Sequence, residues 1–138
     1  MNLWVLDCSL AVATFLPDEN SKLADQFFTK LQNENKAIVP SLWLYEISNV
    51  ILVATRRKRI SEENVSTIFK SIESFPIEVE PSFSPSIMRN IYELGKKHTL
   101  SIYDSAYLEL CIRKNAGLGS LDEKLIQSAK KEKVKIFK

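Results

Sequence analysis

Short, continuously apolar runs alternate along the chain with segments whose apolar residues recur every three or four positions. The first run, Leu3-Trp4-Val5-Leu6, ends abruptly at Asp7. Runs of this length are typical of strands buried on both faces of a parallel sheet, because such strands have no solvent-facing side. The predicted strands are residues 3–6, 37–39, 77–79 and 134–137, with a short strand or turn at residues 117–120.

The segments between these runs have the spacing and the boundary residues of helices. Leu23, Phe27 and Leu31 repeat every four residues behind Ser21, a residue type that caps helix N-termini. Ser41 is predicted to cap a long helix in the same way. One predicted helix ends near residue 16, and others begin at residues 21, 61 and 101. The remaining predicted helices run from residue 42 to about 55, from 84 to about 97, and from 122 to 131.

Strands that alternate with helices predict an α/β domain in which helices cover both faces of a parallel sheet. The 138 residues are the size of one ordinary domain, and no repeat, low-complexity stretch or linker divides them. We therefore expect a single domain over residues 1–138. In open parallel sheets the working site lies beyond the carboxyl ends of the strands, so the residues that follow each strand are the first candidates for chemistry.

Composition and charge exclude several classes of protein. Nineteen Lys and Arg against seventeen Asp and Glu give a net charge of +2, too small to indicate nucleic-acid binding without a local patch. Cys8 and Cys111 lie in apolar stretches typical of buried, reduced thiols, and His98 is the only histidine, which excludes a Cys/His zinc site. Since we find neither a signal peptide nor a membrane span, we expect a soluble, cytoplasmic protein.

Four acidic residues stand where the local sequence gives no strong reason for an acid. Asp7 closes the first apolar run, Asp122 follows the Gly-rich strand end, and Asp104 lies one turn into a helix. Each of these three has an alternative explanation as a helix cap or as part of a capping box. Glu46 lies in the middle of a largely apolar helix, so its alternative is a salt bridge, and Asn49 follows on the same helical stripe.

The four acids taken together favour a metal site. Residues at the carboxyl ends of parallel strands meet at one edge of the sheet, and Glu46 can reach that edge from a neighbouring helix. Clustered carboxylates repel one another and raise each other's pKa values unless a cation lies among them. Ligation by oxygen alone suits Mg²⁺ or Mn²⁺.

Four segments in order resemble a PIN domain, in particular the small single-domain toxins of the VapC type, and the likeness covers almost the whole chain. The segments are Val5-Leu6-Asp7-Cys8-Ser9, then Trp43 to Val50 with Tyr45, Glu46 and Asn49, then Leu100 to Leu108 with Ser101, Tyr103, Asp104 and Tyr107, and finally Leu118-Gly119-Ser120-Leu121-Asp122-Glu123-Lys124-Leu125. Each segment alone is weakly specific, whereas all four in this order are quite specific. Ser120 stands where Thr is usual in the family, and it keeps the hydroxyl.

The resemblance implies a three-layer α/β/α sandwich around a central, mainly parallel sheet of four to five short strands. It also implies an Mg²⁺- or Mn²⁺-dependent endoribonuclease with one or two ions. The implied metal-binding and catalytic acids are Asp7, Glu46, Asp104 and Asp122, and the implied orienting neighbours are Ser9, Asn49 and Ser120. Divalent ions neutralise the phosphodiester and activate water, and one of the carboxylates is a candidate acceptor for the water's proton.

Basic residues close to this site are candidates for RNA binding. Arg56, Arg57 and Arg59 follow Glu46 at the end of its helix, and at 1.5 Å per residue Arg56 would lie roughly 15 Å away. Basic residues also favour the last turn of a helix for electrostatic reasons, so both explanations stay open. The lysines from Lys130 to Lys138 are expected to form a solvated face.

The expected partners and the competing functions follow from the same resemblance. A toxin of this type implies an antitoxin partner and commonly a homodimer, for which Phe27, Phe28 and the helix around Trp43 offer contact surfaces if they are not core. The main alternative is a catalytically inactive module of the same fold that binds RNA or protein. Phosphotransfer domains on parallel sheets are disfavoured, because Ser9 stands where a phosphatase needs a second Asp, and Leu6-Asp7-Cys8 lacks the paired acids of a receiver domain.

Overall fold

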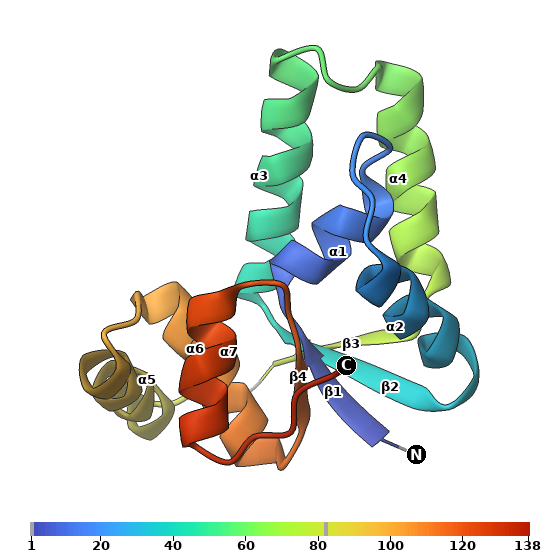
Figure 1. Ribbon diagram of the computed structural model, residues 1–138. Coiled ribbons are helices and arrows are strands. Elements are labelled where there is room, and N and C mark those ends of the chain that lie inside the picture. Colours follow the sequence, from blue (N-terminus) through green and yellow to red (C-terminus); the bar gives the residue numbers. More distant parts are fainter. Residues whose placement is uncertain (1, 82) are drawn as a thin grey trace.

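The computed structural model describes residues 2–81 and 83–138, which form a four-stranded sheet flanked by helices (Figure 1). The strands lie in the order β3-β2-β1-β4, and every neighbouring pair is parallel. Their bounds are β1 Asn2–Leu6, β2 Asn35–Pro40, β3 Ile77–Glu80 and β4 Gly117–Gly119. The helices are α1 Cys8–Phe15, α2 Lys22–Asn33, α3 Leu42–Arg56, α4 Glu62–Ser74, α5 Pro85–His98, α6 Ile102–Lys114 and α7 Glu123–Lys131. The α/β architecture predicted from the alternating pattern is therefore confirmed.

Helices cover the sheet on both sides. In Figure 1, α5, α6 and α7 gather on one side and α2 lies on the other, while α3 and α4 stand together at the top with α1 contacting both. The two central strands are buried, with Val5, Leu6 and Val39 fully inaccessible to solvent. This explains why β1 reads as a continuous apolar run: it has no face that meets water. Phe27 and Phe28 are buried in the core, so core packing accounts for both side chains and neither is available to a partner.

Helix boundaries follow the capping residues in most places. Ser21, Ser61, Ser84 and Ser101 each accept a hydrogen bond from a backbone N–H in the first turn, and Ser61 and Asn64 form a reciprocal capping box. The prediction for Ser41 is wrong. Its backbone is already helical, with φ −57° and ψ −28°, and its side chain makes no capping bond.

The predicted fifth strand is also wrong. The segment over residues 134–137 meets the sheet through one bridge, between Leu118 and Ile136. The backbone N–H of Leu118 donates to Lys135 at 2.8 Å, and Phe137 donates back to Leu118 at 2.9 Å. The segment therefore lies along the sheet edge without forming a ladder, and its apolar pattern reflects packing against the core, where Phe137 is buried.

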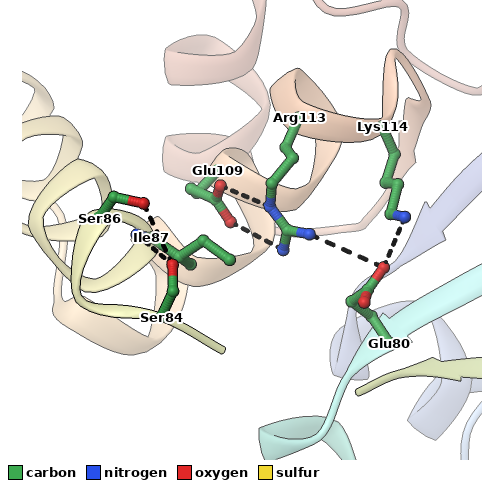
Figure 2. A network of polar contacts seen from close by, with 7 residues as sticks. All are labelled: Glu80, Ser84, Ser86, Ile87, Glu109, Arg113 and Lys114. Atoms are coloured by element: carbon green, nitrogen blue, oxygen red, sulfur yellow. Dashed lines mark hydrogen bonds and ion pairs between the residues drawn. The ribbon is translucent and has the colours of Figure 1, made fainter. Parts of the chain in front are cut away.

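A buried polar network joins the end of β3 to α6, the helix that carries Asp104 (Figure 2). Arg113 donates to Glu109 at 2.8 Å, and the same guanidinium lies 3.7 Å from Glu80. Lys114 lies 2.8 Å from the same oxygen of Glu80. Glu80 and Glu109 are both buried, so these charges need partners inside the fold, and pairing them ties α6 to the sheet.

A second polar contact joins the C-terminal ends of α5 and α7. Glu132 lies 2.8 Å from the Lys97 ammonium and 2.6 Å from Nε2 of His98, whose side chain is almost fully buried. Hydrogen bonds from Lys97 and then from His98 lower the pKa of the Glu132 carboxyl. A lowered pKa in the folded state means that the carboxylate stabilises the fold above its ordinary pKa, and that this stabilisation disappears as the pH falls through the lowered value.

We therefore expect Glu132→Gln to lower the free energy of unfolding by about 1 kcal/mol at pH 7, and to have a progressively smaller effect as the pH falls below the ordinary pKa of a glutamate. Urea unfolding of both proteins at several pH values between 3 and 7 measures this difference. Glu73→Gln, at an exposed position of α4, is the matched control and should behave like the wild type throughout. A difference that is independent of pH would mean that the charge of Glu132 is not what stabilises the fold.

Candidate active site

The structure brings the four predicted acids into electrostatic range of one another. Asp7 follows β1, Asp122 follows β4, Asp104 lies in the first turn of α6 and Glu46 lies in α3. The negative charge of Asp7 acts on both Glu46 and Asp104, and that of Asp122 acts on both Asp7 and Asp104. Register places the ends of β1 and β4 together, since Leu6 pairs with Gly119 and Asp7 donates its N–H to the Gly119 carbonyl at 2.9 Å.

Asp7 is buried and held by two hydroxyl groups. It is 6% exposed, and its Oδ2 accepts hydrogen bonds from Ser9 at 2.7 Å and from Ser120 at 2.6 Å. It occupies the N-cap position of α1 but makes no side-chain capping bond, so the capping explanation is wrong for this residue. Burial raises the pKa of the Asp7 carboxyl; the two hydroxyl bonds partly offset that rise, and Asp122 adds to it.

Ser120 connects two of the acids. Besides donating to Asp7, its oxygen accepts the backbone N–H of Asp122 at 2.9 Å. Ser9 lies 3.4 Å from Ser120 and accepts the N–H of Leu121 at 2.9 Å. The two predicted hydroxyl neighbours therefore fix the turn after β4 against the start of α1, and both bond to the same oxygen of Asp7.

Asp104 and Asp122 combine local and long-range roles. The Asp122 side chain accepts the N–H of Leu125 at 3.0 Å, so its capping explanation is correct as well. Ser101 caps α6 through the N–H of Asp104 at 3.1 Å, but the structure describes no reciprocal bond from the Asp104 carboxylate to the backbone of Ser101. The pKa of Asp104 is raised by burial first, and then by the charges of Asp122 and Asp7.

Glu46 is held by Tyr107, which the sequence analysis named within a matching segment but did not include among the site residues. The hydroxyl of Tyr107, on α6, donates to Oε1 of Glu46 at 2.5 Å. Burial raises the pKa of Glu46, the Tyr107 bond opposes that rise, and the charges of Asp7 and Asp104 add to it. Tyr107 stands three residues after Asp104, on the same face of α6, and that spacing is the signal that would have identified it.

The charge of this cluster is not balanced by ion pairs. Among residues 2–81 and 83–138, none of the four acids lies within 4.0 Å of a Lys, Arg or His nitrogen, so the salt-bridge explanation of Glu46 is wrong. Lys124 exerts a weaker favourable field on Asp104. In the same part of the chain, no three His, Cys, Asp or Glu side chains are arranged to hold a metal ion as they stand.

Within residues 2–81 and 83–138, the remaining predicted residues make no hydrogen bond or ion pair with these acids. Asn49 is exposed on α3, and the described residues show no hydrogen bond from it to an acid. Arg59 is engaged elsewhere, with its guanidinium 2.7 Å from Asp18 and 3.4 Å from Glu19. Arg56 and Arg57 are exposed at the end of α3, and neither forms an ion pair within the described part of the chain.

Cys8 and Cys111 are both free and buried, as predicted. Burial raises the pKa of the Cys8 thiol to about 12, with the charges of Glu46 and Asp7 acting in the same direction. A thiol with this pKa is protonated at neutral pH, so Cys8 is a poor nucleophile and a poor metal ligand despite its place beside Asp7. The site is therefore built from oxygen atoms.

Comparison with known proteins matches nearly the whole chain. Residues 4–132 match the PIN domain. Among curated relatives, Ribonuclease VapC3 of Pyrobaculum aerophilum is 24% identical over 123 residues, which cover 89% of this chain and 92% of that protein. None of the helices formed by residues 2–81 and 83–138 is long and apolar enough to cross a membrane.

Solved structures share the fold at low sequence identity. PAE2754 from Pyrobaculum aerophilum aligns with a TM-score of 0.73 at 17% identity, over 94% of this chain and 86% of that one. VapBC2 from Rickettsia felis, bound to a DNA fragment from their promoter, aligns with a TM-score of 0.70 at 15% identity, over 97% and 96%. FitAcB from Neisseria gonorrhoeae aligns with a TM-score of 0.67 at 12% identity, over 98% and 96%.

Proposed function

Because the chain belongs to the PIN domain family, we propose that it is a metal-dependent endoribonuclease that cleaves RNA phosphodiester bonds. The observation that carries this proposal is the set of four acids whose charges act on one another, with no ion pair to balance them among residues 2–81 and 83–138. Such a cluster costs folding free energy unless it binds a cation, so a structural role alone does not account for it. The similarity to a protein named Ribonuclease VapC3 supports the same substrate class.

The proposed metal ligands are Asp7, Glu46, Asp104 and Asp122, holding one or two Mg²⁺ or Mn²⁺ ions. The donors fit such an ion because they are all carboxylate oxygens, which hard divalent cations prefer. Within residues 2–81 and 83–138 the acids do not form a closed cage as they stand, and a bound cation would offset the repulsion between them. We propose that Ser9 and Ser120 act on Asp7, by keeping one carboxylate oxygen occupied and the other oriented.

The chain's own contribution to the reaction is to position ligands and to accept a proton. A divalent ion bound here supplies charge neutralisation for the phosphodiester and lowers the pKa of the attacking water. Asp7, Glu46 and Asp104 all have raised pKa values, mainly because they are partly or fully removed from water. We propose that one of the four carboxylates also takes the proton of the attacking water.

RNA would be held by the exposed guanidinium groups at the end of α3. Arg56 and Arg57 are the better candidates, since Arg59 is already paired with Asp18 and Glu19. Arginine binds phosphate through paired N–H donors, and contacts of this kind provide affinity without selecting a base. Asn49, on the same helix and exposed, is proposed to face the substrate rather than an acid.

In the cell, we propose that the protein is the toxin of a type II toxin–antitoxin pair, forms one PIN-like domain, and acts in the cytoplasm, where its RNA substrate lies. The relationship to a VapC protein supports an antitoxin partner. The exposed apolar side chains of α3, Leu44, Tyr45 and Leu52, offer a contact surface for that partner or for a homodimer. The alternative is a catalytically inactive PIN-like module that binds RNA or protein.

Removing the metal tests the proposed activity directly. Purified protein should cleave single-stranded RNA in millimolar Mg²⁺ or Mn²⁺, stop when a chelator is added in excess, and resume when the ion is restored. Gel analysis of an end-labelled RNA measures all three stages and shows whether cuts are internal. Cleavage that continues in chelator would contradict metal dependence, and RNA binding without cleavage in either ion would favour the inactive module.

A further inference from the structure

Tyr107 is a core residue whose hydroxyl donates a hydrogen bond to one of the four acids. Its side chain is fully buried, and its neighbours in α6, Ala106, Leu108 and Leu110, are buried apolar residues. Its hydroxyl nevertheless bonds to Glu46, the acid that comes from α3 and is only partly buried. A phenylalanine would fill the same space with no polar group to satisfy, so the hydroxyl calls for an explanation beyond packing.

The hydrogen bond between Tyr107 and Glu46 joins α6 to α3, the two helices that supply Asp104 and Glu46. Asp104 and Tyr107 lie three residues apart on one face of α6, which packs against β1 and β2. Through this hydroxyl, the helix that supplies one acid also fixes the position of another. Glu46 needs such support, because its long side chain projects from α3 and no other described hydrogen bond restrains it.

The geometry also assigns the two oxygens of Glu46 different roles. Oε1 accepts the Tyr107 hydroxyl at 2.5 Å, and the structure describes no hydrogen bond to Oε2. The Tyr107 ring is locked by the core around it, so the direction of its O–H is set by packing and not by solvent. A donor that occupies one oxygen orients the other, as partners of metal-binding side chains commonly do.

We propose that Tyr107 is a positioning residue that orients Glu46 so that Oε2 faces the metal. This inference rests on the proposed function, because it requires that the acids bind a divalent ion. It differs from a packing role in a measurable way: Tyr107 should affect metal binding only while Glu46 is present.

The test is a double-mutant cycle read by Mn²⁺ binding, with free Mn²⁺ counted by electron paramagnetic resonance. Tyr107→Phe, which removes only the hydroxyl, should weaken Mn²⁺ affinity by about 10- to 100-fold. In a Glu46→Ala background, which is already weakened, the same substitution should change the affinity less than twofold. Tyr103→Phe, at an exposed position one turn earlier in α6, is the matched control and should bind Mn²⁺ like the wild type.

A second route covers the case in which Tyr107→Phe does not fold. Glu46→Asp keeps the charge but withdraws the carboxylate from the hydroxyl by one carbon, so it should weaken Mn²⁺ binding to a similar extent. If Glu46→Asp binds Mn²⁺ like the wild type, the inference is overturned, because the held position of the carboxylate would not matter.

The outcomes separate the inference from the function on which it rests. Wild type that binds no Mn²⁺ and cuts no RNA would overturn the proposed function and this inference with it. Wild type that binds Mn²⁺, together with a Tyr107→Phe variant of equal affinity, would overturn the inference alone. An equal loss of affinity with and without Glu46 would do the same, since it would show that Tyr107 acts through the general packing of α6.

Discussion

RNA cleavage by Asp7→Asn is expected to be roughly two to three orders of magnitude slower than cleavage by the wild type. Asparagine keeps the shape of the side chain, and its carbonyl can still accept the bonds from Ser9 and Ser120, but the charge that would hold the metal is lost. The measurement is the initial rate of cleavage of one RNA by both purified proteins under identical Mg²⁺ conditions. Asp25→Asn, at an exposed position of α2, is the matched control and should cleave normally.

Asp7→Asn should lose cleavage activity without losing affinity for RNA. Phosphates are held mainly by Arg and Lys, so Asp7→Asn should bind RNA about as tightly as the wild type. The converse variant, with both Arg56→Ala and Arg57→Ala, should bind RNA more weakly and with a flatter dependence on salt, while it still binds Mn²⁺. If wild type and Asp7→Asn cut RNA at the same rate, the activity comes from a contaminating nuclease or from another site, and the assignment fails.

Saturating Mn²⁺ is expected to raise the melting temperature of the wild type by roughly 8 °C. At an ion concentration about 100 times the dissociation constant, binding to the folded state adds about 2.7 kcal/mol of stability. For a chain of 138 residues, each kcal/mol corresponds to roughly 3 °C. Asp104→Asn removes one proposed ligand and should show a much smaller shift, whereas Asp25→Asn should match the wild type.

The expected rise in melting temperature on Mn²⁺ binding follows from the raised pKa values of the acids. The pKa of Asp7, Glu46 and Asp104 is raised in the folded protein, mainly by burial. A carboxyl with a raised pKa favours the fold below its ordinary pKa, and that contribution is lost as the pH rises through the raised value. At neutral pH the ionised acids therefore destabilise the metal-free protein, and a bound cation reverses the cost. Equal Mn²⁺ shifts in wild type and Asp104→Asn would place the ion elsewhere.

The same acids therefore reduce the stability of the metal-free fold and provide its proposed chemistry. Asp7 illustrates this, since it is 6% exposed and is balanced only by hydroxyl groups and backbone N–H groups. The turn after β4 and the hydroxyl of Tyr107 keep the acids in place without neutralising them. Because no lysine or arginine within residues 2–81 and 83–138 is ion-paired with these acids, a cation that binds here would not have to displace one.

The sequence by itself predicted most of the helices and strands and selected the four acids as candidates. Strand β1 was evident because a strand buried on both faces must be apolar throughout, and Ser61 and Asn64 were evident as a helix start because caps are satisfied by residues close in sequence. The carboxyl-edge rule then brought Asp7 and Asp122 together without any coordinates. The local signal failed only where the environment decided, as at Ser41, whose backbone is already helical.

The resemblance implied Ser9 and Ser120 as neighbours of the acids, but only the tertiary structure decided which atoms they bond and that Tyr107 holds Glu46. Ser120 reaches Asp7 across 113 positions of sequence, and Tyr107 reaches Glu46 across 61. Likewise, Arg59 is engaged by Asp18, 41 positions away, and the segment at residues 134–137 meets β4 through one bridge, between Leu118 and Ile136. A residue's sequence neighbours set its helix or strand, but its hydrogen-bond partner depends on how those elements pack, and that packing involves side chains that no local pattern encodes.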